Sequence, residues 1–192
     1  MAEVIILDRD GVLNTIVVDP EHGTIDSPLH PTQVTLLPGV PEALLTLNHL
    51  GFALAIATNQ PSAAKGKTTE KNLRDTHARV LELAQAAGAR ILSNQLCLHR
   101  SEDGCACRKP QPKMLLDALR DLGADPTHAW MVGDGVTDVE AGQRAGTRTA
   151  FLGPRKCDAC KIFDGHSAAP TVWCADLPAF VRHLEASRPP RP

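Results

Sequence analysis

The sequence of 192 residues contains no tyrosine, and its other aromatic residues are two Trp and four Phe. A surface that stacks several bases needs more aromatic side chains, so this composition argues against one. Basic residues are not in excess either, because 20 Lys and Arg face 22 Asp and Glu and leave a net charge of −2. A protein that binds the phosphate backbone needs a clear basic excess. We therefore expect no nucleic-acid partner.

Long apolar runs are also missing. The longest are about the size of residues 52–57, far short of the roughly 20 residues that cross a bilayer. The first residues, MAEVIILDRDG, carry no basic stretch and no long apolar segment of the kind that forms a signal peptide. We expect no membrane partner and a cytoplasmic location, where thiols stay reduced. The six cysteines are therefore candidates for metal ligands rather than disulfides.

Short apolar runs alternate with longer stretches of helical character. The predicted strands are residues 4–7, 52–57, 90–98, 129–132 and 149–152, and the predicted helices are residues 40–50, 69–87, 112–122, 137–145 and 177–184. This alternation is typical of an α/β fold: a doubly wound, mainly parallel sheet with helices on both faces. We predict one domain over residues 1–186, a loop over residues 18–38 and a frayed tail over residues 187–192.

Acidic and small polar residues follow three of the predicted strands. The motifs are DRDGV (8–12), TNQ (58–60) and GDGVTD (133–138). Ligands of parallel α/β sheets bind at the carboxyl ends of the strands, where these motifs should meet. Asp8 and Asp10 are two residues apart on an extended chain, so their carboxylates point to the same side and require a cation or a catalytic task. A single Asp there could equally cap a helix, but three such strand ends are harder to explain by capping.

Four soft metal ligands lie within eleven residues: Cys97, His99, Cys105 and Cys107. Two such pairs on a polar loop can close a tetrahedral zinc site, and a site with four protein ligands is structural rather than catalytic. Arg108 and Lys109 follow at once, so zinc over residues 97–107 would fix their position. A second set, Cys157, Cys160, His166 and Cys174, is either another zinc site or a surface turn with free thiols and a buried Cys174.

The motifs DRDGV, TNQ, RKP (108–110) and GDGVTD occur in this order over residues 4–155, and together they resemble the haloacid dehalogenase superfamily of phosphatases. The resemblance implies a magnesium-dependent phosphomonoester hydrolase that works through an aspartyl-phosphate. It also implies that Asp8 is the nucleophile and that Asp10 is first general acid and then general base. There are two alternatives. One is a phosphotransferase that uses the same aspartyl-phosphate intermediate, and the other is a zinc-bearing binding module without catalytic activity.

The resemblance assigns further roles at this site. Mg²⁺ would be held by Asp8, the backbone carbonyl of Asp10 and Asp134, while Lys109 would stabilise the transferring phosphoryl group. Asp138 would orient Lys109 or the metal shell. The residues expected to contact phosphate or substrate are Gly11, Thr58, Asn59, Gln60, Arg108 and Lys109.

The sequence CxH…CxCRKP, placed after DRDGV and TNQ, resembles the capless branch that contains heptose bisphosphate phosphatases and histidinol-phosphatase domains. The segments around residues 22–25 and 59–70 favour D-glycero-D-manno-heptose 1,7-bisphosphate, with release of the 7-phosphate. The short gap between the zinc-ligand pairs favours histidinol phosphate. A small phosphorylated sugar is thus the expected substrate, an amino-alcohol phosphate is the alternative, and the chain is expected to act as a monomer.

Overall fold

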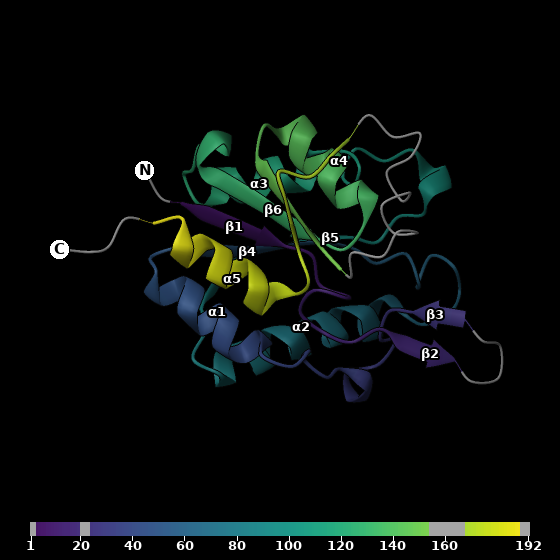
Figure 1. Ribbon diagram of the computed structural model, residues 1–192. Helices are drawn as coiled ribbons and strands as arrows, with labels where there is room; N and C mark the ends of the chain where they lie inside the picture. Colours follow the sequence, from purple (N-terminus) through teal and green to yellow (C-terminus); the bar gives the residue numbers. More distant parts are fainter. Residues whose placement is uncertain (1–2, 20–23, 154–167, 189–192) are drawn as a thin grey trace.

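The computed structural model describes residues 3–19, 24–153 and 168–188, and its centre is a six-stranded sheet (Figure 1). The strand order is β5-β4-β1-β6-β7-β8, and every neighbouring pair is parallel. The strands are β1 Val4–Leu7, β4 Ala53–Asn59, β5 Ile91–Cys97, β6 Ala129–Gly133, β7 Arg148–Leu152 and β8 Val172–Cys174. Because β1 lies between β4 and β6, the three strands that carry the acidic and TNQ motifs are adjacent.

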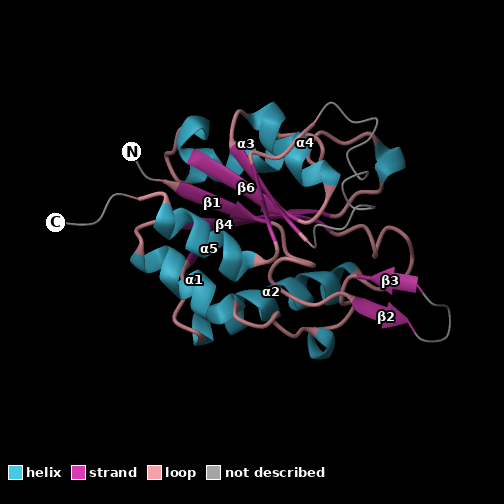
Figure 2. Ribbon diagram, in the orientation of Figure 1, coloured by secondary structure: helices cyan, strands magenta, loops and turns pink. Residues whose placement is uncertain are grey.

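Helices cover both faces of this sheet (Figure 2). One face carries α1 Val40–His49, α2 Glu70–Ala86 and α5 Leu177–Ala186, and the other carries α3 Lys113–Asp121 and α4 Val136–Ala145. Alternate residues of β1 serve the two cores, because successive side chains of a strand point to opposite faces. Ile5 and Leu7 pack with the first group, and Val4 and Ile6 with the second. The predicted doubly wound α/β fold is confirmed.

The predicted loop over residues 18–38 is wrong in part, because it contains a small antiparallel hairpin. Val18 and Ile25 form a β-branched pair that favours extended backbone, and a salt bridge of 2.5 Å from Lys67 to Asp26 ties the hairpin to the segment after β4. The strand β8 was also not predicted, because three residues are too few to show a period. The elements that complete the fold are β2 Val17–Asp19, β3 Thr24–Asp26 and the 3₁₀ turns Pro31–Gln33, Ser101–Asp103 and Pro126–His128.

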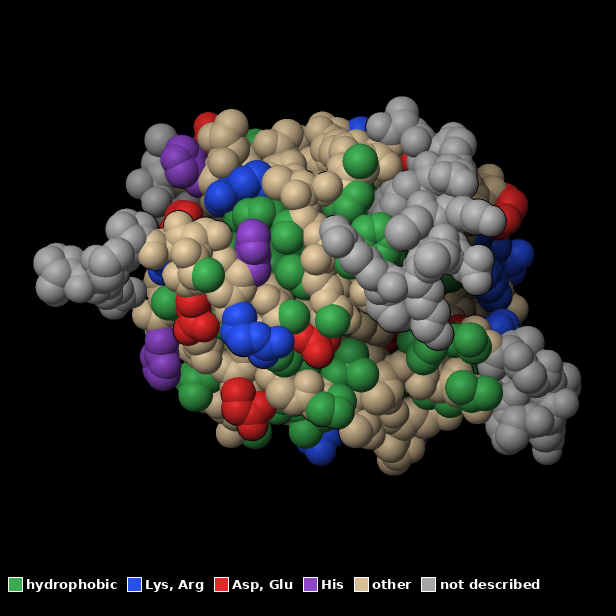
Figure 3. Space-filling model, viewed as in Figure 1, with side chains coloured by type: hydrophobic (Ala, Val, Ile, Leu, Met, Phe, Trp, Pro, Cys, Tyr) green, Lys and Arg blue, Asp and Glu red, His purple; other side chains and the backbone are tan. Residues whose placement is uncertain are grey.

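The chain beyond α5 is anchored at Arg188, which differs from the prediction of a tail frayed from residue 187. The Arg188 guanidinium donates to the backbone carbonyl of Leu50 and to the Glu3 carboxylate, both at 2.5 Å, and it lies over the Phe52 ring. Among the described residues, no helix has both the length and the apolar character required to span a membrane. On the face drawn in Figure 3, acidic and basic side chains are scattered rather than gathered by sign.

Candidate active site

Asp8 and the turn that follows it lie at the carboxyl end of the central strand. The Asp8 amide donates to the carbonyl of Val132 on β6 at 2.9 Å, which continues the sheet pairing by one residue. Gly11 has a φ of +80°, and a Cβ there would lie 2.0 Å from an Asp134 carboxylate oxygen. Only glycine therefore lets the turn after β1 approach Asp134 this closely.

Three carboxylates meet at this edge. One oxygen each of Asp8, Asp134 and Asp138 lies within 4.8 Å of the others. The Lys109 ammonium forms ion pairs with Asp8 at 3.0 Å and with Asp138 at 2.5 Å, and it donates to the Ala57 carbonyl at 2.8 Å. Lys109 is buried, with 2% of its side chain exposed. One buried cation thus faces three acids, which leaves an excess of negative charge.

This excess of negative charge shifts the pKa values of the groups in the site. Burial and the charges of Asp8 and Asp138 raise the pKa of Asp134 to about 7. Burial also raises the pKa of Asp138 to about 6, against the opposing effect of Lys109. Although burial opposes the shift, the charges of Asp138 and Asp8 raise the pKa of Lys109 above its ordinary value. Crowded carboxylate oxygens of this kind are the ligand set that Mg²⁺ prefers, so the residues present fit that ion.

The TNQ motif supports the site from β4. The Asn59 side chain clamps the Lys109 backbone, because it donates to the Lys109 carbonyl at 3.1 Å and accepts from its amide at 3.0 Å. Gln60 is fully buried, and its amide donates to Asp10 at 2.5 Å and to the Thr58 hydroxyl at 3.0 Å. The side chains of Asn59 and Gln60 therefore hold other residues of the site in place.

The Asp10 carboxylate does not belong to the three-carboxylate cluster and lies within a set of donors. Arg9 donates to both of its oxygens, and Asn14 and Gln60 donate to one each. Although burial opposes the shift, the Arg9 charge and hydrogen bonds from Asn14 and Gln60 lower the pKa of Asp10. Arg9 and Asn14 are absent from the predicted site. A charged residue inside a motif that follows an apolar strand was the available signal.

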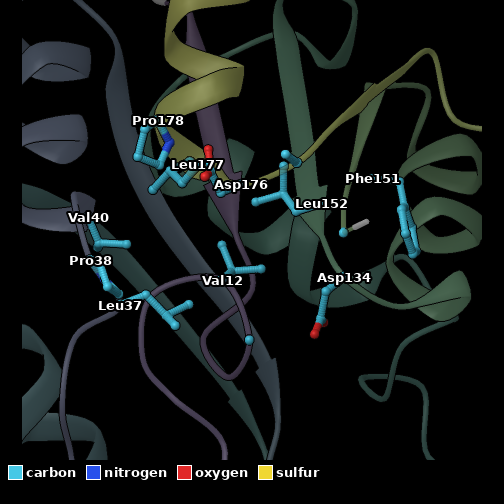
Figure 4. Close-up of a pocket in the computed structure, with 13 residues that line it drawn as sticks. Val12, Leu37, Pro38, Val40, Asp134, Phe151, Leu152, Asp176, Leu177 and Pro178 are labelled. Atoms are coloured by element: carbon cyan, nitrogen blue, oxygen red, sulfur yellow. The ribbon is translucent and has the colours of Figure 1, made fainter. Parts of the chain in front are cut away.

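An apolar cavity of about 560 Å³ opens beside Asp134 (Figure 4). Its walls come from the turn after β1, the segment before α1, the end of β7 and the start of α5. They include Val12, Leu37, Leu152 and Leu177. A largely apolar wall solvates charge poorly, which agrees with the raised pKa of the Asp134 carboxyl.

The four predicted zinc ligands converge in the structure. Sulfur–sulfur distances are 3.2 Å for Cys107–Cys97, 3.5 Å for Cys107–Cys105 and 3.7 Å for Cys97–Cys105, and His99 Nδ1 lies 3.3 Å from the Cys107 sulfur. Tetrahedral ligands with zinc bonds of roughly 2.0–2.3 Å lie about 3.3–3.8 Å apart. Burial and the hydrogen bond with Cys107 raise the pKa of the Cys97 thiol to about 12. Such a crowded thiol set fits a divalent metal that favours the thiolates.

A smaller cavity of about 300 Å³ borders Lys109 on the side of this cysteine loop. Arg100, Arg108 and Thr137 line it, and the Arg108 guanidinium donates to the His99 carbonyl at 3.1 Å. In the second candidate metal set, residues 157, 160 and 166 lie outside the described part of the chain. Cys174 is buried in β8.

Comparison with known proteins places this geometry in context. The model of the family "haloacid dehalogenase-like hydrolase" matches residues 27–146. A D-glycero-β-D-manno-heptose-1,7-bisphosphate 7-phosphatase of Pseudomonas aeruginosa is 37% identical over 138 residues, which cover 72% of this chain and 74% of that protein. The Pasteurella multocida protein of the same name is 34% identical over 97% of this chain and 100% of its own.

Among solved structures, the D,D-heptose 1,7-bisphosphate phosphatase of B. bronchiseptica complexed with magnesium and phosphate has a TM-score of 0.80. It is 29% identical to this chain, and the match covers 97% of this chain and 99% of that one.

Proposed function

The chain belongs to the haloacid dehalogenase-like hydrolases and is a phosphatase, and from this premise we propose that it removes the 7-phosphate of D-glycero-β-D-manno-heptose 1,7-bisphosphate. The family resemblance found in the motifs is confirmed. The observation that carries the proposal is the place of Asp8, whose carboxylate lies at the end of the central strand beside Lys109 and Asp134. Relatives of the same name over most of the chain support this substrate.

The metal of the reaction is Mg²⁺, and Asp8, Asp134 and the backbone carbonyl of Asp10 would hold it. An ion held there would supply positive charge that offsets the phosphate, so that the anionic Asp8 carboxylate can approach phosphorus. Asp8 then attacks phosphorus in line and forms an aspartyl-phosphate as the bond to the sugar oxygen breaks. Asp10 protonates that oxygen, and later takes a proton from the water that hydrolyses the intermediate.

Positive charge and backbone donors would stabilise the phosphoryl group during transfer. Lys109 supplies its ammonium, and Thr58 and the backbone amide of Asn59 donate to the same oxygens. Asp138 pairs with Lys109 and so fixes the direction of its ammonium. Gly11 allows the turn after β1 to approach Asp134. The Gln60 side chain donates a hydrogen bond to the Asp10 carboxylate.

The second phosphate of the substrate would bind near Arg108. This guanidinium borders the cavity next to Lys109, and Arg100 lines the same cavity. A bisphosphate needs a further cation that a monophosphate does not. Histidinol phosphate is the alternative substrate, favoured by the short loop between the zinc-ligand pairs.

A phosphate-release assay tests the substrate. We expect heptose 1,7-bisphosphate to give the highest kcat/KM, by about tenfold or more, and to lose one phosphate while the C1 phosphate remains. Histidinol phosphate, fructose 1,6-bisphosphate and glycerol phosphate serve as competitors. A preference for histidinol phosphate, or phosphate release only in the presence of an acceptor alcohol, would contradict the proposal.

The variant Arg108→Met separates the two substrates further. It should raise the KM for the bisphosphate by about tenfold, because one charged hydrogen bond is lost. The KM for histidinol phosphate should stay unchanged. Arg120→Met is the matched control, because the Arg120 side chain on α3 is 74% exposed.

We also propose a structural zinc ion on Cys97, His99, Cys105 and Cys107. The purified protein should contain about one zinc per chain. Cys107→Ser should reduce this to near zero and lower kcat by about tenfold or more, because Arg108 and Lys109 follow the loop directly. Elemental analysis and phosphate release measure both. Glu102→Gln, in the exposed turn of the same loop, is the control, and full activity of a zinc-free protein would contradict the proposal.

A further inference from the structure

Among the residues that the structure describes, Arg9 is the largest side chain with no exposed surface, although it stands between two acids of the site. Its guanidinium forms a fork with the carboxylate of its neighbour: Nε donates to Asp10 Oδ1 and Nη2 to Oδ2, both at 3.1 Å. The remaining nitrogen, Nη1, is buried and has no hydrogen-bond partner within the described part of the chain. Burying an arginine is costly, and an apolar side chain of similar volume is often as stable or more so. Core stability alone therefore does not explain Arg9.

Two further donors complete the environment of Asp10. Asn14 donates to Oδ1 at 2.8 Å and Gln60 donates to Oδ2 at 2.5 Å, so each carboxylate oxygen accepts from two donors. We call Arg9, Asn14 and Gln60 the Asp10 seat. A carboxylate held by four donors cannot rotate freely, so the seat fixes the direction of the Asp10 carboxylate.

The seat is itself held by the backbone. The Arg9 amide donates to Asp8 Oδ1 at 2.7 Å, and the Arg9 carbonyl accepts from the amides of Leu13 and Asn14 at 2.8 and 3.1 Å. The backbone amide of Gln60 donates to the Cys97 carbonyl at 2.7 Å. These bonds fix the donors relative to the nucleophile, which is the condition for orienting a catalytic group.

We propose that Arg9 is a positioning residue that holds the Asp10 carboxylate for the hydrolysis of the aspartyl-phosphate; this inference rests on the proposed function. In that step the water oxygen bonds to phosphorus, the phosphorus–oxygen bond to Asp8 breaks with its electron pair returning to the Asp8 carboxylate, and the water proton passes to Asp10. A base must lie within hydrogen-bond reach of that proton. The Arg9 side chain is fully buried and donates to the Asp10 carboxylate, so the guanidinium acts through Asp10.

Arg9→Met keeps most of the buried volume and removes the fork, and 4-nitrophenyl phosphate is the probe. Its phenolate leaves without a proton, so forming the aspartyl-phosphate from it needs no acid, whereas hydrolysing the intermediate still needs the base. We expect the first turnover to stay within about twofold of wild type, while the steady rate falls by about 10- to 100-fold. Stopped-flow absorbance should then show a burst of about one phenolate per site. Arg9→Lys, with one charge but no fork, should recover part of the steady rate.

A merely structural role would lower both phases together, and that result, or an unchanged steady rate, would overturn the proposal. The double variant Arg9→Met/Asp10→Asn should be no slower than Asp10→Asn alone, and an additive loss of rate would also overturn the proposal.

If Arg9→Met does not fold, Gln60→Met tests the same seat. It should also show a burst of phenolate, with a smaller fall in the steady rate, and a Gln60→Met variant without a burst counts against the proposal. A wild type that hydrolyses 4-nitrophenyl phosphate but not heptose bisphosphate contradicts only the proposed substrate. A wild type inactive on both overturns the inference along with the proposed function.

Discussion

The Asp8→Asn variant is expected to fold like the wild-type protein and to release phosphate more slowly by on the order of 10⁴-fold or more. The amide has the shape of the carboxylate but is a far weaker nucleophile, so no aspartyl-phosphate can form. Phosphate release from heptose bisphosphate, together with thermal unfolding, measures both parts of this prediction.

The fold should survive because Asp8 is only one of two acids on the buried lysine. Lys109 also forms an ion pair of 2.5 Å with Asp138, and we expect the variant to retain it. The Asp8 charge also contributes to the raised pKa of Asp134, so its loss removes repulsion in the metal-free protein. We therefore expect the melting temperature without Mg²⁺ to change little or to rise slightly.

Asp75→Asn is the matched control for this substitution. Asp75 pairs with Lys71 on the surface of α2, and 45% of its side chain is exposed. Such a pair contributes about 0.5 kcal/mol or less, and activity should be unchanged. Activity of Asp8→Asn within tenfold of wild type would remove Asp8 from the role of nucleophile.

The central part of the fold could be predicted because its signals are local. The apolar run 4–7 coincides with β1, and the runs near 129–132 and 149–152 differ from β6 and β7 by one residue at one end. Continuous apolar strands occur where both sheet faces are covered, and β1, β4, β6 and β7 meet this condition. The three residues of β8 cannot show a period, and its pairing with β7 is a tertiary effect.

The candidate site could be predicted only where spacing and strand ends determine proximity. Cys97 and Cys107 are ten residues apart, so a short loop brings them together, and Asp8 and Asp134 end adjacent strands. The direction of the Asp10 side chain depends on the turn after β1 and on donors such as Gln60, fifty residues away. No pattern in DRDGV indicates that Arg9 folds back on its own neighbour.

Lys109→Met is expected to reduce activity by on the order of 10³-fold and to destabilise the protein. The ammonium is the buried cation between Asp8 and Asp138, and removing one donor to a transition-state oxygen costs about 10²- to 10³-fold. Removing one partner of a buried ion pair costs about 3–5 kcal/mol, because the remaining charge is left without compensation. Phosphate release and urea unfolding without Mg²⁺ measure the two effects, and Lys113→Met, on an exposed pair with Asp117, is the control.

The loss of stability should depend on pH in a defined direction. Lys109 opposes the burial that raises the pKa of Asp138 to about 6, so without Lys109 this pKa rises further. A carboxyl whose folded pKa exceeds its unfolded value destabilises the protein as pH rises above the unfolded value and through the folded one. Lys109→Met should thus lose less stability at pH 5, where Asp138 takes up a proton, than at pH 8. An equal loss at both pH values, or activity within tenfold of wild type, would show that Lys109 does not balance these acids.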